Sequence, residues 1–75
     1  MDLDDDKIDE AALALLALTL HDESRAWKQL DWDVLDRLYE KDLISNPKSK
    51  AKSIVLTEEG VAAAWKACER LFKKT

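Results

Sequence analysis

The stretch SIVLTEEGVAAAW, residues 53–65, decides the fold of this chain because a β-branched run passes directly into a capped helix. Thr57 follows the run IVL, and its hydroxyl group can cap a helix. Two glutamates come next, where the helix dipole favours acids. The only glycine, Gly60, takes the third helical position. We predict that this turn passes close to another backbone segment, the hairpin or the first helix, where a Cβ atom would intrude.

The residues before this stretch predict a small β-hairpin with a basic tip. The segment DLIS precedes Asn46 and Pro47, which are a turn signal, and the alternating segment KSKAKS then leads into IVL. On a strand, Lys48, Lys50 and Lys52 would lie on one face, because successive side chains point to opposite faces.

Apolar residues at helical spacing predict the helices. The first covers roughly residues 6–20, and Asp31 is the expected N-cap of a second over residues 31–41. Residues 22–30 fit either a short helix or an extended turn. The last helix follows Thr57, and its apolar stripe consists of Val61, Ala64, Trp65, Cys68, Leu71 and Phe72. The predicted fold is mainly α with a small β-hairpin, in the order α-α-α-β-β-α.

A chain of 75 residues has room for one domain. We expect residues 1–75 to form that domain, with residues 1–5 as a flexible acidic start. The hydrophobic share of 47% and the charged share of 37% indicate a folded protein rather than a disordered tail. A domain of this size buries only about 60% of the surface that its unfolded chain exposes, so self-association stays open.

The segments LDRLYEKDLIS and KSIVLTEEG together resemble the winged helix-turn-helix regulators of the MarR and PadR type. In that resemblance, residues 31–41 take the place of the recognition helix and residues 46–52 that of the wing tip. Leu56, Thr57 and Gly60 take the place of the motif that opens the C-terminal helix. The resemblance implies a winged-helix-like fold and contact with DNA.

Asp42 departs from this pattern, because winged-helix proteins usually have glycine there, and aspartate adopts the left-handed conformation less readily. The whole chain also resembles a small bacterial domain family of unknown function, through the landmarks LTLHDE, AWK, DWD, LDRL and LTEEG. That second likeness implies no activity.

Charge is unevenly distributed within the net charge of −4. Residues 1–10 carry −5 and residues 31–42 carry −3, whereas residues 45–53 carry +3 and no acid. The candidate phosphate-contacting residues are Lys48, Lys50, Lys52, Arg37 and Lys41. Acids on the predicted recognition helix oppose this reading, since they would face the phosphates. A lysine-rich loop also simply keeps a hairpin edge unpaired.

Three residues are candidates for binding a protein partner. Trp27 lies in the segment whose structure is open, whereas Trp32 and Trp65 are expected in the core, which large aromatic side chains fill efficiently. Ala63 and Ala67 lie beside the apolar stripe of the last helix, where small side chains allow close helix packing.

Metal-binding and catalytic motifs are incomplete in this sequence. The alternating aspartates at positions 2, 4 and 6 lack the glycine and glutamate of a calcium loop, and His21, Asp22 and Glu23 have no second histidine to complete a zinc site. Cys68 is expected to be a buried structural residue. We therefore expect no enzyme, no cofactor, no metal and no small-molecule substrate.

The longest apolar run, AALALLALTL, is about half as long as a membrane helix requires, and no secretion signal is visible. We expect a cytoplasmic protein without a membrane span. Two functions remain open. One is a protein interaction or homodimerisation module, and the other is weak contact with nucleic acid through the basic wing.

Overall fold

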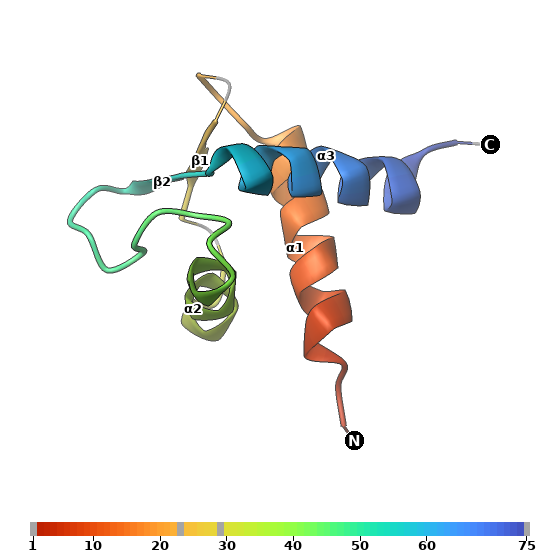
Figure 1. The fold of residues 1–75 in the computed structure, drawn as a ribbon, viewed down its shortest axis with the longest axis horizontal. Coiled ribbons are helices and arrows are strands. Elements are labelled where there is room, and N and C mark those ends of the chain that lie inside the picture. The colour runs from red at the N-terminus through yellow and green to blue at the C-terminus, as the bar shows by residue number, and fades with distance from the viewer. Residues whose placement is uncertain (1, 23, 29, 75) are drawn as a thin grey trace.

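The computed structural model describes residues 2–22, 24–28 and 30–74. Within these residues the elements are the helices α1 (Asp5–Leu18), α2 (Trp32–Glu40) and α3 (Glu58–Phe72) and the strands β1 (Arg25–Trp27) and β2 (Ser53–Val55) (Figure 1). The expected mainly helical fold with a small antiparallel sheet is confirmed. The expected order α-α-α-β-β-α is wrong, because the observed order is α-β-α-β-α.

The difference arises in the segment between α1 and α2, where a strand forms. β1 pairs antiparallel with β2, with Ala26 opposite Ile54. Both of these side chains are fully buried, whereas Arg25 and Trp27 on either side of Ala26 are exposed. The alternation buries one small residue, and the backbone hydrogen bonds of β2 outweigh the weak helical preference of a short polar segment.

The predicted hairpin is present in a shorter form. Ser45 N donates to Val55 O at 2.7 Å, Thr57 N donates to Leu43 O at 3.0 Å, and Ile44 forms an isolated bridge with Leu56. Residues 53–57 therefore lie between β1 and residues 43–45. The connecting residues 46–52 form turns and bends rather than the expected strand.

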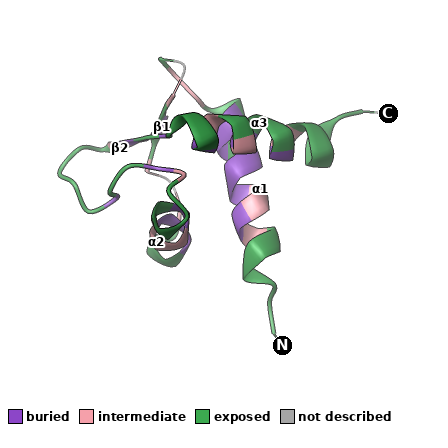
Figure 2. Ribbon diagram, viewed as in Figure 1, coloured by how far each residue is buried: buried purple, intermediate pink, exposed green. Residues whose placement is uncertain are grey.

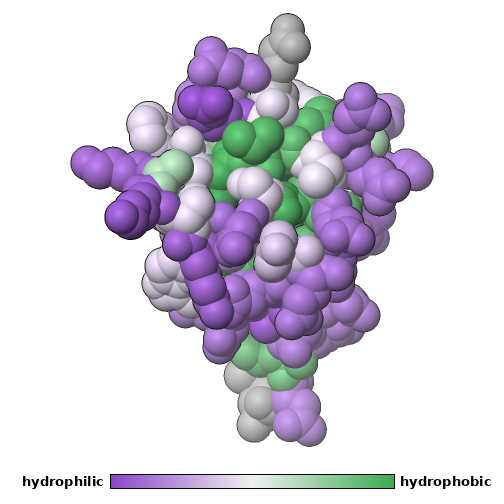
Figure 3. All heavy atoms as spheres, turned by 60° about the vertical axis from the view of Figure 1, so that its left-hand side comes forward, coloured by the Kyte–Doolittle hydropathy of each residue, from purple (hydrophilic) through white to green (hydrophobic). Residues whose placement is uncertain are grey.

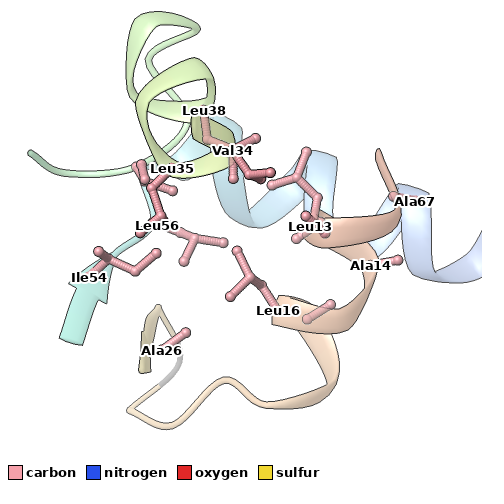
Figure 4. Close-up of a cluster of buried hydrophobic side chains, with 14 residues drawn as sticks. Leu13, Ala14, Leu16, Ala26, Val34, Leu35, Leu38, Ile54, Leu56 and Ala67 are labelled. Atoms are coloured by element: carbon pink, nitrogen blue, oxygen red, sulfur yellow. The ribbon is translucent and has the colours of Figure 1, made fainter. Parts of the chain in front are cut away.

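The core is small and α1 runs through its middle. Figure 2 shows buried residues along the central part of α1, and Figure 4 shows side chains from all five elements converging on one cluster. Its largest fully buried hydrophobic side chains are Leu35, Leu38, Ile44 and Ile54. On the face drawn in Figure 3, the larger of the hydrophobic areas lies in the upper centre, and hydrophilic residues border it.

Helix α3 packs across α1 through small residues. Gly60, Ala64 and Ala67 are buried, and Ala14 and Ala17 are buried on α1. The expected apolar stripe of the last helix is only partly correct, because its large members, Trp65, Leu71 and Phe72, are exposed. Small residues on both helices allow a close crossing, which turns the larger side chains outward.

Gly60 confirms the close approach predicted from the sequence. A Cβ atom on Gly60 would lie 1.9 Å from the carbonyl oxygen of Leu43. The hydroxyl group of Thr57 accepts a hydrogen bond from Gly60 N at 2.9 Å and donates one to Asp42 O at 2.7 Å. Asp42 takes the left-handed conformation, with φ of 60°, and this lets the chain turn directly after α2.

We predict that Gly60→Ala destabilises the protein by about 1–3 kcal/mol, because a backbone oxygen occupies the space of the new methyl group. The free energy of unfolding is measured by thermal and urea denaturation. At an unconstrained helical position, replacing glycine by alanine would stabilise by about 1 kcal/mol.

The matched control is Ala62→Gly on the exposed side of the same helix, which should destabilise by about 1 kcal/mol through helix propensity alone. A Gly60→Ala protein that melts higher than the wild type would contradict the close approach.

Candidate functional site

A buried carboxylate joins α1 to α2. The side chain of Asp9 is 3% exposed, and both of its oxygens accept hydrogen bonds from Arg37 Nε at 3.0 Å. Arg37 Nη2 adds a bond at 2.8 Å, and Lys41 Nζ donates to Asp9 at 3.0 Å and to Asp6 at 3.3 Å. Burial raises the pKa of Asp9, but the hydrogen bonds from Arg37 and Lys41 outweigh it and lower that pKa below its usual value.

This cluster separates the five candidate phosphate contacts into two groups. Arg37 and Lys41 point to α1, where the carboxylate of Asp9 neutralises much of their charge. Lys48 instead lines a hollow beside Asp36 and Glu40 of α2. The structure therefore does not bring Arg37 and Lys41 together with the loop lysines.

Sequence reasoning overlooked Asp9 and its role, although a signal was present. Asp9 lies four residues before Leu13 and three before Ala12, so it occupies the buried stripe of α1. An acid on an apolar stripe requires a cationic partner, because an unpaired buried charge is costly.

The loop lysines have a cationic neighbour, Lys28, that sequence reasoning also missed. Lys28 N donates to Lys52 O at 3.1 Å, and Lys28 Nζ donates to Ser49 O at 2.8 Å. Arg25 is the first residue of β1, and its side chain is exposed. The pairing of β1 with β2 could not be read from spacing. It places Lys28 beside the loop and leaves Arg25 at the other end of the strand, opposite Val55.

The three candidate partner-binding residues have different environments. Trp27 is 51% exposed, and its ring lies 4.9 Å from the ring of His21 between centroids. Ala67 is buried and Ala63 half-buried, and both line the hollow between α1 and α3. The two alanines thus serve the packing within the chain, and Trp27 is available to a partner.

The expectation that Trp32 and Trp65 fill the core is wrong, because they are 55% and 50% exposed. Leucine, isoleucine and alanine fill the core instead, and a core of this size has no room for an indole between helices that cross through alanines.

Exposed large residues gather where α1, β1 and α3 meet, and we call this region the apolar surface. It is formed by Leu15, Leu18, Trp27, the half-buried Leu30, Trp65 and Phe72. One hollow of 320 Å³ contains the first four of these residues, and a second of 400 Å³ contains Leu18, Trp65 and Phe72 together with Cys68. Because Leu18 lines both hollows, the two adjoin.

Three further features of the sequence are the metal-ligating side chains, the single cysteine and the long apolar run. Residues 2–22, 24–28 and 30–74 contain no cluster of three or more His, Cys, Asp or Glu residues that could hold a metal ion. Glu23 lies outside these ranges. Cys68 is half-buried and its thiol is free. In the described part of the chain, no helix is both long enough and apolar enough to cross a bilayer.

The chain belongs to a family described as a domain of unknown function (DUF6429), whose model matches residues 4–74. It is similar to the uncharacterized protein y4hR of Sinorhizobium fredii (strain NBRC 101917 / NGR234). The two are 53% identical over 74 residues, which cover 99% of this chain and 100% of the relative. No solved structure matches the chain significantly. The resemblance to a family of unknown function is thereby confirmed.

We predict that Asp9→Asn lowers the free energy of unfolding by about 2 kcal/mol, because Arg37 and Lys41 lose hydrogen bonds to a charged acceptor. The measurement is urea denaturation at neutral pH. The control is Asp5→Asn, whose carboxylate is 64% exposed and 3.9 Å from Arg37, and which should change stability by less than about 0.5 kcal/mol. Equal effects of the two changes would show that the buried cluster is unimportant.

The same cluster predicts a loss of stability in acid. Since the pKa of Asp9 is lower in the folded protein than the usual 3.8, the folded state favours the ionised carboxylate. Its contribution is complete above a pH of about 4 and is lost as the pH falls through the lowered folded value. Melting temperatures measured against pH should therefore fall more steeply below this point for the wild type than for Asp9→Asn.

Proposed function

We propose that this protein is a non-catalytic interaction module that forms a homodimer through the apolar surface. The observation that carries the proposal is the gathering of large exposed side chains on adjoining parts of α1, β1 and α3. Trp27 lines one hollow and Trp65 lines the other. Tryptophan is enriched among residues that dominate binding energy.

The total exposed area supports the same proposal. The chain exposes 5505 Å², whereas a folded monomer of 8.6 kDa is expected to expose about 4,700 Å². The difference of about 800 Å² is close to the area that each partner loses in a standard-size interface. The exposed residues 2–4 supply part of this excess, and the flat shape of the molecule, 39 × 34 × 19 Å, supplies another part.

A second copy of this chain fits the border of the apolar surface. Glu69 and Lys73 lie at the edge of the hollow that contains Trp65 and Phe72, and within one chain they form an ion pair at 3.7 Å. In a two-fold arrangement the same patch faces itself, so the lysine of one copy can lie opposite the glutamate of the other. A homodimer therefore needs no further partner of complementary charge.

The absence of catalysis is part of this proposal and rests on the environment of the reactive groups. The histidine ring is stacked beside Trp27, and the cysteine borders an apolar hollow. The groups with shifted pKa values, Asp9, Arg37 and Lys41, are explained by their mutual ion pairs. Shifted pKa values of this kind occur in structural ion pairs as well as in catalytic sites.

Weak DNA contact through a winged-helix-like arrangement is the second candidate. It is favoured by the loop of residues 46–52, which joins residues 43–45 to β2, and by the left-handed Asp42. Within the described residues only α2 lies between β1 and this loop, whereas a helix-turn-helix has two helices there. Asp33 and Glu40 are also exposed on α2, which weakens its fit to phosphates.

We predict that Leu18→Glu converts the dimer into a monomer, because the change places a charge where both hollows of the apolar surface meet. Leu18 is 59% exposed in the single chain, so the folded monomer should lose less than about 0.5 kcal/mol of stability. Light scattering coupled to size exclusion measures the mass over a wide concentration range.

The matched control is Leu3→Glu, since Leu3 is 64% exposed and lies outside the apolar surface. This variant should remain dimeric. A wild-type protein that stays strictly monomeric at every concentration would refute the homodimer.

A further inference from the structure

The hollow between α1 and α3 is a second concave region, separate from the apolar surface. It has a volume of about 300 Å³, and Lys41, just after α2, lies on its third side. That volume is at the lower end of the range for ligand pockets, about 300–1,000 Å³. The hollow shares no lining residue with the two hollows of the apolar surface except members of neither cluster of large exposed side chains. It can therefore be occupied in a single copy of the chain.

Small residues of α3 create this hollow. Four lining residues are spaced i, i+3, i+4 and i+7 and so share one face of α3, namely Ala63, Lys66, Ala67 and Arg70. Because the side chain of an alanine ends at Cβ, the space between the longer side chains of α1 and α3 stays open. The apolar floor is completed by Leu13, Leu38 and Leu43.

The acids that line the hollow all have cationic partners within the chain. Asp6 and Asp9 are paired with Lys41, and Glu10 is paired with Arg70. A cationic ligand would have to displace one of these partners from its carboxylate. The hollow is therefore poorly suited to a cation.

Two cations of α3 retain donors for an anion. Among the described residues, no ion pair involves Lys66. Arg70 donates to Glu10 with Nε and Nη2, and in the described part of the chain its Nη1 makes no hydrogen bond. Lys66 and Arg70 are four residues apart on one helix, a spacing that puts their Cβ atoms about 5–6 Å apart. One carboxylate can reach both.

The charges around the hollow select an anion of single charge. The lining contains three acids and three cations, namely Asp6, Asp9, Glu10, Lys41, Lys66 and Arg70, so its formal charges sum to zero. A phosphate monoester carries about 1.5 to 2 negative charges at neutral pH and would meet the acids of α1. A carboxylate brings one charge, and the apolar floor suits a hydrocarbon body.

We propose that this hollow binds a small carboxylic acid with an apolar body. The carboxylate lies between Lys66 and Arg70, and the hydrocarbon part covers Ala63 and Ala67. This binding does not rest on the homodimer, because none of these four residues belongs to the apolar surface.

The test is an NMR titration of the ¹⁵N-labelled protein with octanoate at neutral pH. Octan-1-ol and octylammonium serve as neutral and cationic probes of the same chain length. We expect octanoate to shift the amide signals of Ala63, Lys66 and Ala67, and to bind about tenfold more tightly than octan-1-ol, through one charge-assisted hydrogen bond or more.

Three outcomes of this titration overturn the proposal. The first is the absence of shifts at millimolar octanoate. The second is equal affinity for octanoate and octan-1-ol, since the cations would then play no part. The third is a set of shifts confined to Leu18 and Trp65, which would place the acid on the apolar surface.

The decisive variant is Lys66→Gln, which should weaken octanoate binding about tenfold because a charged donor is lost. Lys66 is exposed, so the fold is retained. The matched control is Lys74→Gln, beyond the end of α3, which changes the net charge equally and should leave the affinity unchanged. Equal losses in both variants would refute a localised site. Lys66→Arg should restore binding.

A variant of the floor tests the shape of the site. Ala63→Leu keeps both cations and fills the hollow, so it should abolish octanoate binding. Since Ala63 is half-buried, its melting curve is recorded first, and Lys66→Gln decides alone if this variant does not fold. A folded Ala63→Leu protein that binds like the wild type would overturn the position of the site. Leu18→Glu should bind octanoate normally, which separates this proposal from a failure of the homodimer.

Discussion

The close approach of Gly60 to the carbonyl group of Leu43 is the constraint on which the rest of the structure depends. At this point the first turn of α3 lies against the chain that leaves α2. The backbone N–H of Thr57 donates to the same carbonyl oxygen, and its hydroxyl group donates to Asp42 O. The end of α2, residues 43–45 and the start of α3 are thereby held together, which fixes the direction of β2 and the path of α3 across α1.

The path of α3 determines which side chains a partner can reach. Glycine and alanines face α1, because only small side chains permit so close a crossing. The aromatic residues of the same helix are then turned outward, where they join Leu18 and the exposed side of α1. The small core and the large apolar surface therefore both result from the close crossing of α3 and α1. A domain of this size buries little further apolar area within a single chain from which it could gain stability.

The distribution of charge follows from the same arrangement. Arg37 of α2 and Lys41 just after it form ion pairs with the buried Asp9 of α1. The charges of these two side chains are therefore paired within the chain. Among the described residues, no ion pair involves Arg25, Lys28 or the loop lysines.

The sequence by itself indicated a close backbone approach at Gly60, although not that Leu43 is the partner. It also determined the local features, which are the Thr57 and Asp31 caps and the approximate helices. These depend on neighbouring residues, so spacing and residue type suffice to predict them. Only the tertiary structure decided that residues 25–27 form a strand, that Arg37 and Lys41 bind Asp9, and that the tryptophans stay exposed. Each of these depends on segments far apart in the chain, because strand pairing, ion pairing and helix crossing are settled by which partner lies within reach.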